Sequence, residues 1–253
     1  MDELEEKIER LASMISESKR IVAFTGAGVS TESNIPDFRS SKGVYESIQK
    51  EYKQPAERLL SHSYFEAHPE IFFDYLRRFL VFPDALPNDA HKSLAALERI
   101  GKLSCVVTQN IDGLHTKAGN KNVCELHGSL YRNYCIKCGE KYDLDFVLSA
   151  KDIPRCKKCG GIVRPDVVLY EELLDEDVME KAANEIINAD MLLIMGTSLA
   201  VYPAAGFIRY FRGENIVIIN RDATPYDGSA KLLIKAKAGE TMRAVMNKCK
   251  IEF

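Results

Sequence analysis

The sequence predicts an α/β protein: a Rossmann-like, doubly wound parallel sheet with a smaller lobe made of a helical insertion and a zinc-ribbon insertion. Compact apolar runs at residues 20–25, 103–108, 191–195 and 216–220 indicate buried strands. These runs are apolar throughout, without alternating polar residues, which is typical of parallel strands covered by helices on both faces. Helical patterns separate the runs, as the crossovers between parallel strands require.

Helices are expected where apolar residues recur at helical spacing. The first segment, with Leu4, Ile8, Leu11 and Ile15, predicts an amphipathic helix docked on the sheet. Further helices are expected over residues 89–100, 175–188, 204–211 and 239–248.

Two stretches interrupt this alternation of strands and helices. Residues 36–88 contain aromatics, prolines and helical patterns but no convincing strand, and residues 128–166 contain paired cysteines. We therefore expect a Rossmann-like domain formed by residues 1–35, 89–127 and 167–253. The helical insertion would comprise residues 36–88, and the zinc-ribbon module residues 128–166.

Composition and charge exclude several classes of protein. The chain carries 34 basic and 37 acidic side chains, and a net charge of −3 gives no indication of nucleic-acid binding by bulk electrostatics. The N-terminal segment is acidic and helical, unlike a signal peptide, and the apolar runs are far too short to span a bilayer. Seven cysteines without an export signal favour a reducing compartment, so we expect a cytoplasmic protein without a membrane partner.

Four cysteines indicate a metal site. Cys135 and Cys138 form one Cys-x-x-Cys pair, Cys156 and Cys159 form a second, and seventeen residues separate the pairs. Two such turns supply the four thiolates of a tetrahedral Zn²⁺ site. Two disulfides or four free thiols are the alternatives. We expect one structural Zn²⁺, because four sulfur ligands leave no open position for catalysis.

A glycine-rich turn at residues 26–28 follows the first predicted strand, as in a dinucleotide phosphate loop. Its glycines would permit a tight turn and a close approach to pyrophosphate, and Ser30 and Thr31 would offer hydroxyl donors. A plain tight turn would give the same pattern. A dehydrogenase, which transfers hydride to or from NAD, continues from this turn into a helix. Here Pro36 interrupts that helix, so the arrangement for hydride transfer is missing. Asn220, which ends a later strand, is the alternative ribose contact.

Several motifs together resemble the sirtuin (Sir2) family of NAD-dependent protein lysine deacylases, in both order and spacing. Besides the two cysteine pairs, they are GAGVSTESNIPDFR at 26–39, TQNIDGLH at 108–115, ELHGS at 125–129, GTSL at 196–199 and VIINRD at 217–222. The resemblance covers residues 10–250. It implies an NAD-dependent protein deacetylase that transfers the acetyl group of an acetyl-lysine to ADP-ribose and releases nicotinamide.

The resemblance also implies the catalytic residues. His127 matches the base that acts on a ribose hydroxyl, a task for which an imidazole is suited at neutral pH. His115 is the competing histidine, and the resemblance gives it a structural role. Asn110 matches the residue that positions water near the reacting ribose carbon.

The implied NAD contacts come from several segments that follow predicted strands. Phe38 is expected to shield the reacting centre from water, Asp112 to support the nicotinamide pocket, and Arg39 to order the cofactor loop of the helical insertion. The other expected contacts are Gly26, Ala27, Gly28, Ser30, Thr31, Ile35, Asp37, Gln109, Asn110, Ile111, His127, Gly196, Thr197, Ser198, Asn220, Arg221 and Ala238.

On the substrate side, residues 166–172 align with the family segment that pairs with the peptide backbone as an added strand. Val168, Leu169 and Tyr170 are the expected contacts, with acetylated proteins or peptides as partners. Glu171 replaces the usual glycine, which predicts a preference for basic residues near the acyl-lysine.

The acyl pocket is expected to include Leu76 and Phe79, counted without gaps from Pro69. An apolar pair offers no counter-charge to a carboxylate, so neutral acyl groups are predicted, acetyl first. A register shifted by one residue would instead bring Tyr75 and Arg78 to these positions and would predict acidic acyl groups.

Two other functions fit parts of the sequence. An ADP-ribosyltransferase would use the same NAD pocket with a different acceptor. A zinc-ribbon module that binds nucleic acid or protein would use residues 131–164, where eight basic and four acidic side chains give a local charge of +4. The tyrosines of that stretch do not form a stacking series, so nucleic acid is not an expected partner.

Overall fold

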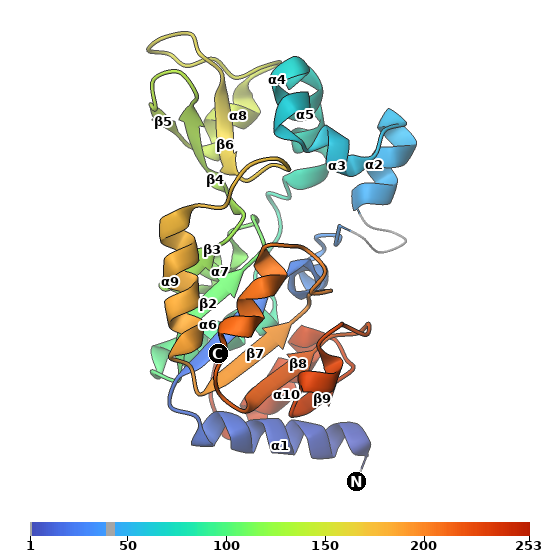
Figure 1. Cartoon of the computed structure of the whole chain (residues 1–253), viewed down its shortest axis with the longest axis vertical. Coiled ribbons are helices and arrows are strands. Elements are labelled where there is room, and N and C mark those ends of the chain that lie inside the picture. The colour runs from blue at the N-terminus through green and yellow to red at the C-terminus, as the bar shows by residue number, and fades with distance from the viewer. Residues whose placement is uncertain (1, 39–43) are drawn as a thin grey trace.

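A six-stranded parallel sheet forms the centre of the larger lobe in the computed structural model, which describes residues 2–38 and 44–253 (Figure 1). The strand order is β3-β2-β1-β7-β8-β9. The chain adds β2 and β3 on one side of β1, and it adds β8 and β9 on the far side of β7, so the direction of strand addition reverses between β1 and β7. Ligands of doubly wound sheets bind at this switch point, beyond the carboxyl ends of the strands. The strands are β1 (Ile21–Thr25), β2 (Leu103–Thr108), β3 (Val123–Glu125), β7 (Met191–Met195), β8 (Asn215–Ile219) and β9 (Leu232–Ile234).

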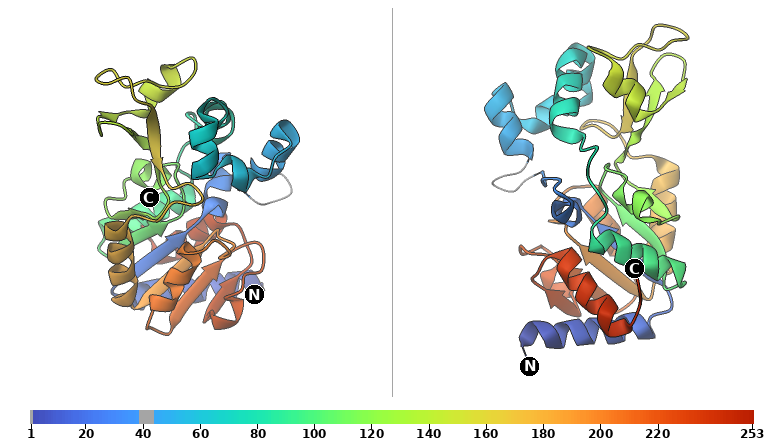
Figure 2. Two further views of the ribbon diagram at one scale, coloured as in Figure 1. Left: turned by 45° about the horizontal axis from the view of Figure 1, so that its top comes forward. Right: turned by 180° about the vertical axis from the view of Figure 1, so that it is seen from behind.

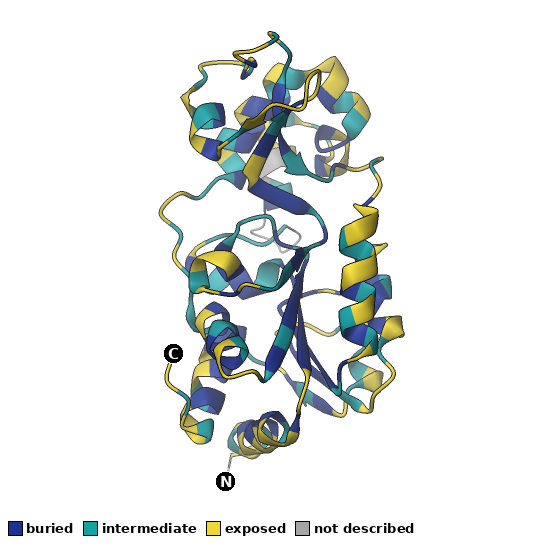
Figure 3. Ribbon diagram, turned by 90° about the vertical axis from the view of Figure 1, so that its left-hand side faces the viewer, coloured by how far each residue is buried: buried dark blue, intermediate teal, exposed yellow. Residues whose placement is uncertain are grey.

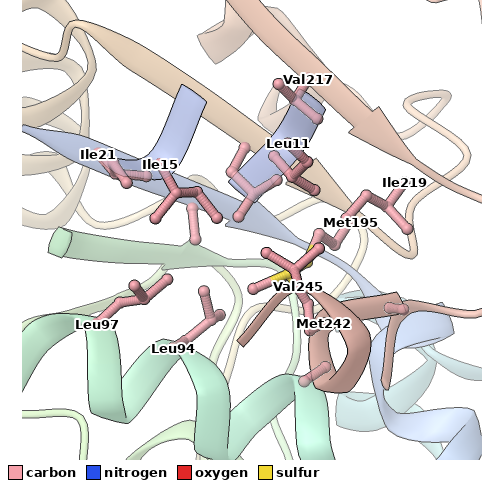
Figure 4. Packing of buried hydrophobic residues seen from close by; sticks show 14 of the residues in the cluster. Leu11, Ile15, Ile21, Leu94, Leu97, Met195, Val217, Ile219, Met242 and Val245 are labelled. Carbon is pink, nitrogen blue, oxygen red and sulfur yellow. The ribbon is translucent and has the colours of Figure 1, made fainter. Parts of the chain in front are cut away.

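Helices cover both faces of the sheet (Figure 2). On one face, α1 (Glu3–Glu17), α6 (Asp89–Arg99) and α10 (Ala238–Cys249) pack against alternate residues of the strands. Figure 4 shows this contact, where Leu11 and Ile15 of α1 and Val245 of α10 meet side chains of the sheet. The other face packs against α9 (Glu176–Ile187) and the 3₁₀ helix η3 (Ala204–Tyr210). Burial of both faces is the reason that the central strands are mostly apolar and lack a regular alternation of polar residues.

The predicted fold class is confirmed, with differences in detail. The strands expected at 103–108 and 191–195 form over those residues, and the other two differ by one residue at their ends. The edge strands β3 and β9 were not predicted. Residues 204–210, expected as an ordinary helix, form a 3₁₀ helix instead.

The two insertions pack together as the smaller lobe. The first provides α2 (Val44–Tyr52), α3 (Ala56–Leu59), α4 (His62–Ala67), α5 (Pro69–Tyr75) and the π-helical turn η2 (Leu76–Leu80). The second provides an antiparallel sheet, in the order β5-β4-β6, and α8 (Leu144–Ser149). Its strands are β4 (Gly128–Cys135), β5 (Lys141–Tyr142) and β6 (Val163–Val167). Phe65, Phe72 and Phe73 share one apolar cluster with Leu130 and Val163, which joins the two insertions.

Three short elements complete the chain: η1 (Ala27–Ser33) after β1, α7 (Leu114–Ala118) after β2, and η4 (Asp227–Ser229) after β8. Figure 3 shows the buried strands between helices whose outer surfaces are exposed. Across residues 2–38 and 44–253, no helix has the combined length and apolar character needed to cross a membrane.

Candidate active site

The site is a cavity of about 450 Å³ at the carboxyl ends of β1, β2, β7 and β8, with the smaller lobe contributing part of its wall. A cavity of this size is typical of cofactor and ligand sites. Most residues expected to bind NAD or substrate line it, although they come from segments far apart in the sequence. They are Gly26, Ala27, Gly28, Thr31, Asp37, Phe38, Gln109, Asn110, Ile111, His127, Val168, Leu169, Tyr170, Gly196, Thr197, Ser198, Asn220, Arg221 and Ala238.

A smaller cavity adjoins the first and shares Ala27, Phe38, Asn110 and Ile111 with it. It is lined by three further residues from the predicted NAD set, Ser30, Ile35 and Asp112, and by Phe79. Arg39, also predicted, lies outside the described residues.

The floor of the main cavity depends on two glycine turns in close contact. The Gly28 N–H donates to the Gly196 carbonyl at 2.8 Å. A Cβ on Gly28 would lie 2.8 Å from that carbonyl oxygen, and a Cβ on Gly26 would lie 2.8 Å from the Thr197 Cβ. Gly196 has a φ of +57°. The turns after β1 and β7 therefore approach each other closely only because they lack side chains, which leaves backbone exposed to a ligand.

The hydroxyl groups of the first turn are used within the protein. Thr31 Oγ1 donates to the Gly28 carbonyl at 2.9 Å, and Ser30 Oγ donates to Asp112 Oδ2 at 2.6 Å. Both protons stabilise the turn and its neighbours in this structure, and donation by these hydroxyls to phosphate stays a prediction.

His127 is half-buried in the cavity wall and hydrogen-bonded to the backbone of Gln109. Its Nδ1 lies 3.0 Å from the Gln109 carbonyl oxygen. A carbonyl can only accept, so Nδ1 carries the proton and the lone pair resides on Nε2. The Gln109 side chain in turn donates to Thr197 Oγ1 at 3.0 Å. The imidazole is thus held in the tautomer that a base requires.

Asn110, Ser30 and Asp112 form a chain of hydrogen bonds beneath the cavity. Asn110 Nδ2 donates to Ser30 Oγ at 3.1 Å, and Ser30 donates onward to Asp112. Burial raises the pKa of Asp112, while its hydrogen bonds from Ser30 and the Leu114 N–H partly oppose that rise. This chain fixes the orientation of the buried Asn110 amide at the boundary of both cavities.

His115 is placed differently from His127. It is buried below the loop after β2, lines neither cavity, and its Nε2 lies 3.0 Å from Thr25 Oγ1. Burial, with a smaller contribution from the nearby His91, lowers the pKa of His115 far below its usual value. A histidine held neutral in the core fits the structural role that the resemblance implies.

Aromatic and charged residues bridge the cavity mouth. Phe38 packs edge-on against Tyr45, with ring centroids 5.7 Å apart, and the Tyr45 hydroxyl lies 2.8 Å from that of Tyr170. Arg221 lies 3.8 Å from Asp37, which joins the loop after β8 to the start of the helical insertion.

The expected substrate segment begins at the end of β6. The Val168 N–H donates to the His127 carbonyl at 3.0 Å, so this segment and the candidate base are joined directly. Glu171 has a φ of +77°, the left-handed conformation for which glycine is suited. Its carboxylate accepts from the Ser63 N–H and Oγ at the start of α4, at 2.9 and 3.0 Å. Glu171 therefore connects the segment to the helical insertion.

The two residues expected at the acyl pocket differ in position. Phe79 lines the smaller cavity, whereas Leu76 is fully buried in the apolar cluster of the lobe and lines neither cavity. Leu80, which was not predicted, lines both. In the alternative register, Tyr75 is buried, but Arg78 is exposed and pairs with Glu51 at 2.9 Å and with Asp74 at 3.4 Å.

Four thiols converge in the smaller lobe. The Sγ atoms of Cys135, Cys138, Cys156 and Cys159 all lie within 4.8 Å of one another, and two of the separations are 3.5 and 3.6 Å. Zn–S bonds of about 2.3 Å in a tetrahedron place the sulfurs about 3.8 Å apart. The donor set and its spacing fit a four-coordinate metal, which suggests a zinc site.

Comparison with known proteins places this arrangement in one family. The Sir2 family profile matches residues 26–203. The chain belongs to the Sir2 family. It is 52% identical over 242 residues to the NAD-dependent protein deacetylase of Clostridium acetobutylicum, covering 95% of this chain and 98% of that protein. It is 53% identical over 245 residues to that of Clostridium perfringens, covering 96% and 100%. A solved structure of Sir2 with a p53 peptide and NAD⁺ superposes with a TM-score of 0.85 at 36% identity, covering 97% of this chain and 99% of that one.

The cavity of this Sir2 family member includes residues that sequence reasoning missed. Leu60 of the helical insertion, Val201 and Tyr202 after β7, and Glu32 of η1 all line it. Glu32 accepts from the Gly239 N–H at 2.7 Å and thereby joins η1 to the start of α10. Leu60, Val201 and Tyr202 lie outside the motifs named above, and Glu32 lies within the motif at 26–39 but was not expected to bind, so only the fold reveals that these four residues line the cavity.

Proposed function

We propose that this chain is an NAD-dependent protein deacetylase that acts on acetyl-lysine, with His127 as its general base. The observation that carries the proposal is the His127 imidazole in the cavity wall, held by the Gln109 carbonyl with its lone pair on Nε2. The Clostridium relatives named as NAD-dependent protein deacetylases, and the Sir2 structure with a p53 peptide and NAD⁺, support both substrates.

The cavity suits NAD at the switch point of the sheet. Close contact of the turns at Gly28 and Gly196 leaves room for a pyrophosphate, and Asn220 and Arg221 extend the cavity beyond β8 for the adenosine portion. When bound, NAD supplies the electrophilic ribose carbon and the hydroxyl that accepts the acetyl group. Asn110 orients water and the ribose, while Phe38 excludes bulk water from the reacting centre.

His127 has a defined role in this reaction. Its Nε2 accepts a proton from a ribose hydroxyl, and the Nδ1–H bond to the Gln109 carbonyl stabilises the ring as its positive charge forms. The base and the proposed substrate segment are connected through their backbones, because the Val168 N–H donates to the carbonyl of His127. Movement of the base therefore changes the position of the substrate segment as well.

Neutral acyl groups are the proposed substrates. The apolar side chains Leu60, Phe79 and Leu80 line the cavities, and the Arg78 guanidinium is paired with Glu51 and Asp74 at the surface. A buried carboxylate without a counter-charge is costly, so succinyl groups are disfavoured.

One Zn²⁺ held by the four cysteines would have a structural role. With four thiolates it has no open position, so it would stabilise the smaller lobe without taking part in the reaction. All seven cysteines are free in the structure, in accord with a reducing compartment, and we propose the cytoplasm.

The decisive experiment follows the products by mass spectrometry. Wild type and His127→Ala are incubated with an acetyl-lysine peptide, with and without NAD, and His68→Ala serves as a control because His68 is an exposed histidine outside both cavities. We expect wild type and His68→Ala to deacetylate the peptide only with NAD and to form O-acetyl-ADP-ribose, and His127→Ala to form neither product. NAD consumption with the peptide still acetylated would instead support ADP-ribosyl transfer. Intact NAD with a folded, zinc-loaded protein would overturn the proposal.

A further inference from the structure

We propose that the buried ion pair between Arg164 and Glu172 is a positioning device for the peptide substrate. It would set the backbone shape of residues 167–172, along which the acyl-lysine segment lies, and hold that segment against His127. The inference rests on the proposed deacetylase function, but neither residue is expected to touch NAD or to take part in proton transfer. Arg164 lines neither cavity, and Glu172 lines the main cavity together with the proposed substrate residues Leu169 and Tyr170.

Arg164 is only 4% exposed, and every part of its guanidinium has a partner. Nε donates to the Pro165 carbonyl at 3.2 Å, and one terminal nitrogen donates to the Val167 carbonyl at 2.6 Å. The two terminal nitrogens reach Glu172 Oε1 at 2.5 Å and Oε2 at 3.1 Å. The guanidinium also lies over the Phe65 ring, 5.1 Å from its centroid. One side chain thus fixes the end of β6, the residue five positions beyond it, and helix α4.

Glu172 closes the same loop from its other end. Its Oε2 accepts from the Leu169 N–H at 2.8 Å, and its Oε1 lies 2.8 Å from His62 Nδ1. Burial opposes the charge, but hydrogen bonds from Arg164, the Leu169 N–H and His62 outweigh it and lower the pKa of Glu172. The carboxylate therefore remains charged at neutral pH and draws the ends of the 167–172 turn together.

This turn holds the backbone groups that flank the proposed substrate. The Tyr170 N–H donates to the Leu60 carbonyl, and its carbonyl accepts from the His62 N–H, both at 3.0 Å. Tyr170 therefore pairs its backbone with the helical insertion, while Val168 pairs with His127 on the other side. Beyond the end of β6, this segment has only an isolated bridge between Tyr170 and Ser61 and these single hydrogen bonds, and the Arg164–Glu172 pair adds a constraint that ties its two ends together.

Lysine cannot replace arginine in this geometry. The planar guanidinium contacts two carbonyls and both carboxylate oxygens at once, whereas an ammonium has three donors and no fixed plane. Arg164→Lys keeps the charge but loses the planar group that donates to both carboxylate oxygens. We expect residues 167–172 to become mobile without loss of the sheet that binds NAD.

The test measures Arg164→Lys beside a matched control, Arg132→Lys. Arg132 lies on the neighbouring strand β4 and also bonds two carboxylates, those of Glu125 and Asp166, but its side chain is 54% exposed. Glu172→Gln is the second variant, for the case that Arg164→Lys does not fold; it retains the size of the side chain but loses the charge and one of the two acceptor oxygens. For each protein we would measure peptide KM, kcat, NAD affinity by calorimetry, zinc content, and hydrogen exchange of residues 165–174.

We expect Arg164→Lys and Glu172→Gln to raise peptide KM by about tenfold, the loss that follows from weakening a charged hydrogen bond. NAD affinity and zinc content should stay within about twofold, and hydrogen exchange should accelerate at residues 167–172, whereas Arg132→Lys should behave as wild type. An unchanged peptide KM in a folded variant, or an equal loss of NAD affinity, would overturn the positioning role. An inactive wild-type protein would instead refute the proposed function. The hydrogen-exchange comparison would then test on its own whether the Arg164–Glu172 pair fixes residues 167–172.

Discussion

Replacing Gly196 by alanine is expected to destabilise the protein by about 2 kcal/mol and to weaken NAD binding by at least about tenfold. Gly196 has a φ of +57°, and a Cβ there would lie 2.3 Å from the Val29 backbone nitrogen and 2.5 Å from the Gly28 carbonyl carbon. Both atoms belong to the peptide bond between Gly28 and Val29, so no rotation of a side chain relieves the clash. The turns after β1 and β7 would have to separate.

Gly101 provides a matched control for the magnitude. It also has a positive φ, +75°, but a Cβ there would meet nothing within 4 Å. Both alanines incur about 1 kcal/mol of left-handed strain, and only Gly196→Ala adds about 2 kcal/mol of overpacking. Alanine also lowers the chain entropy of the unfolded state, which offsets the destabilisation of each variant by up to about 1 kcal/mol. The difference between the two variants therefore isolates the close approach of the turns.

The assay is urea unfolding of both variants, with NAD titration by calorimetry. We expect Gly101→Ala to lose about 1 kcal/mol or less and to bind NAD as wild type does, because it lies at the opposite end of the sheet from the cavity. Equal destabilisation of the two variants would show that backbone strain, without the contact between turns, explains these glycines. Unchanged NAD affinity in Gly196→Ala would refute the proposed phosphate site.

Three further predictions test other parts of the molecule. Burial lowers the pKa of His91 from 6.5 to about 4, so the contribution of His91 to stability, fully present above pH 6.5, should fall by about 3 kcal/mol as pH drops to 4, in addition to the decline caused by His115, whose pKa burial also lowers. His91→Gln should flatten that decline, and an equally steep curve would contradict the assignment. Cys156→Ser should lose zinc and melt at a lower temperature, whereas Cys249→Ser, outside the cluster, should keep one zinc per chain by elemental mass spectrometry. Succinyl-lysine peptides should be turned over at less than about one-hundredth of the acetyl-lysine rate, and comparable kcat/KM values for both peptides would show that a cation reaches the acyl pocket.

The fold was predictable from the strands that lie in its centre, and least predictable at its edges. Strands β1 and β7 are buried on both faces, so their composition is apolar throughout and marks them in the sequence. The edge strands β3 and β9 have only three residues each, and Val123–Glu125 ends on a charged side chain. So short a segment has no periodicity to detect, and its pairing with a neighbour determines its conformation.

The residues of the site that lie in motifs were predictable, and the contacts between those residues were not. Motif residues such as His127 and Asn110 were identified by resemblance, and the fold brings them to one cavity. What the sequence could not show are contacts between distant segments, such as Ser30 with Asp112 or Glu172 with Arg164 and His62. These contacts require two or more elements to be placed in space first.

Glu171 illustrates how such contacts change an interpretation. From the sequence alone, a glutamate in place of glycine predicts a negative charge offered to basic substrates. In the structure, its carboxylate accepts two hydrogen bonds from Ser63 at the start of α4, and these lower the pKa of Glu171. The same turn carries Glu172, which binds Arg164, so two adjacent carboxylates fasten the substrate segment to different elements of the smaller lobe. Substrate preference in this chain is therefore expected to depend less on the charge of Glu171 than on the fixed backbone between Val168 and Glu172.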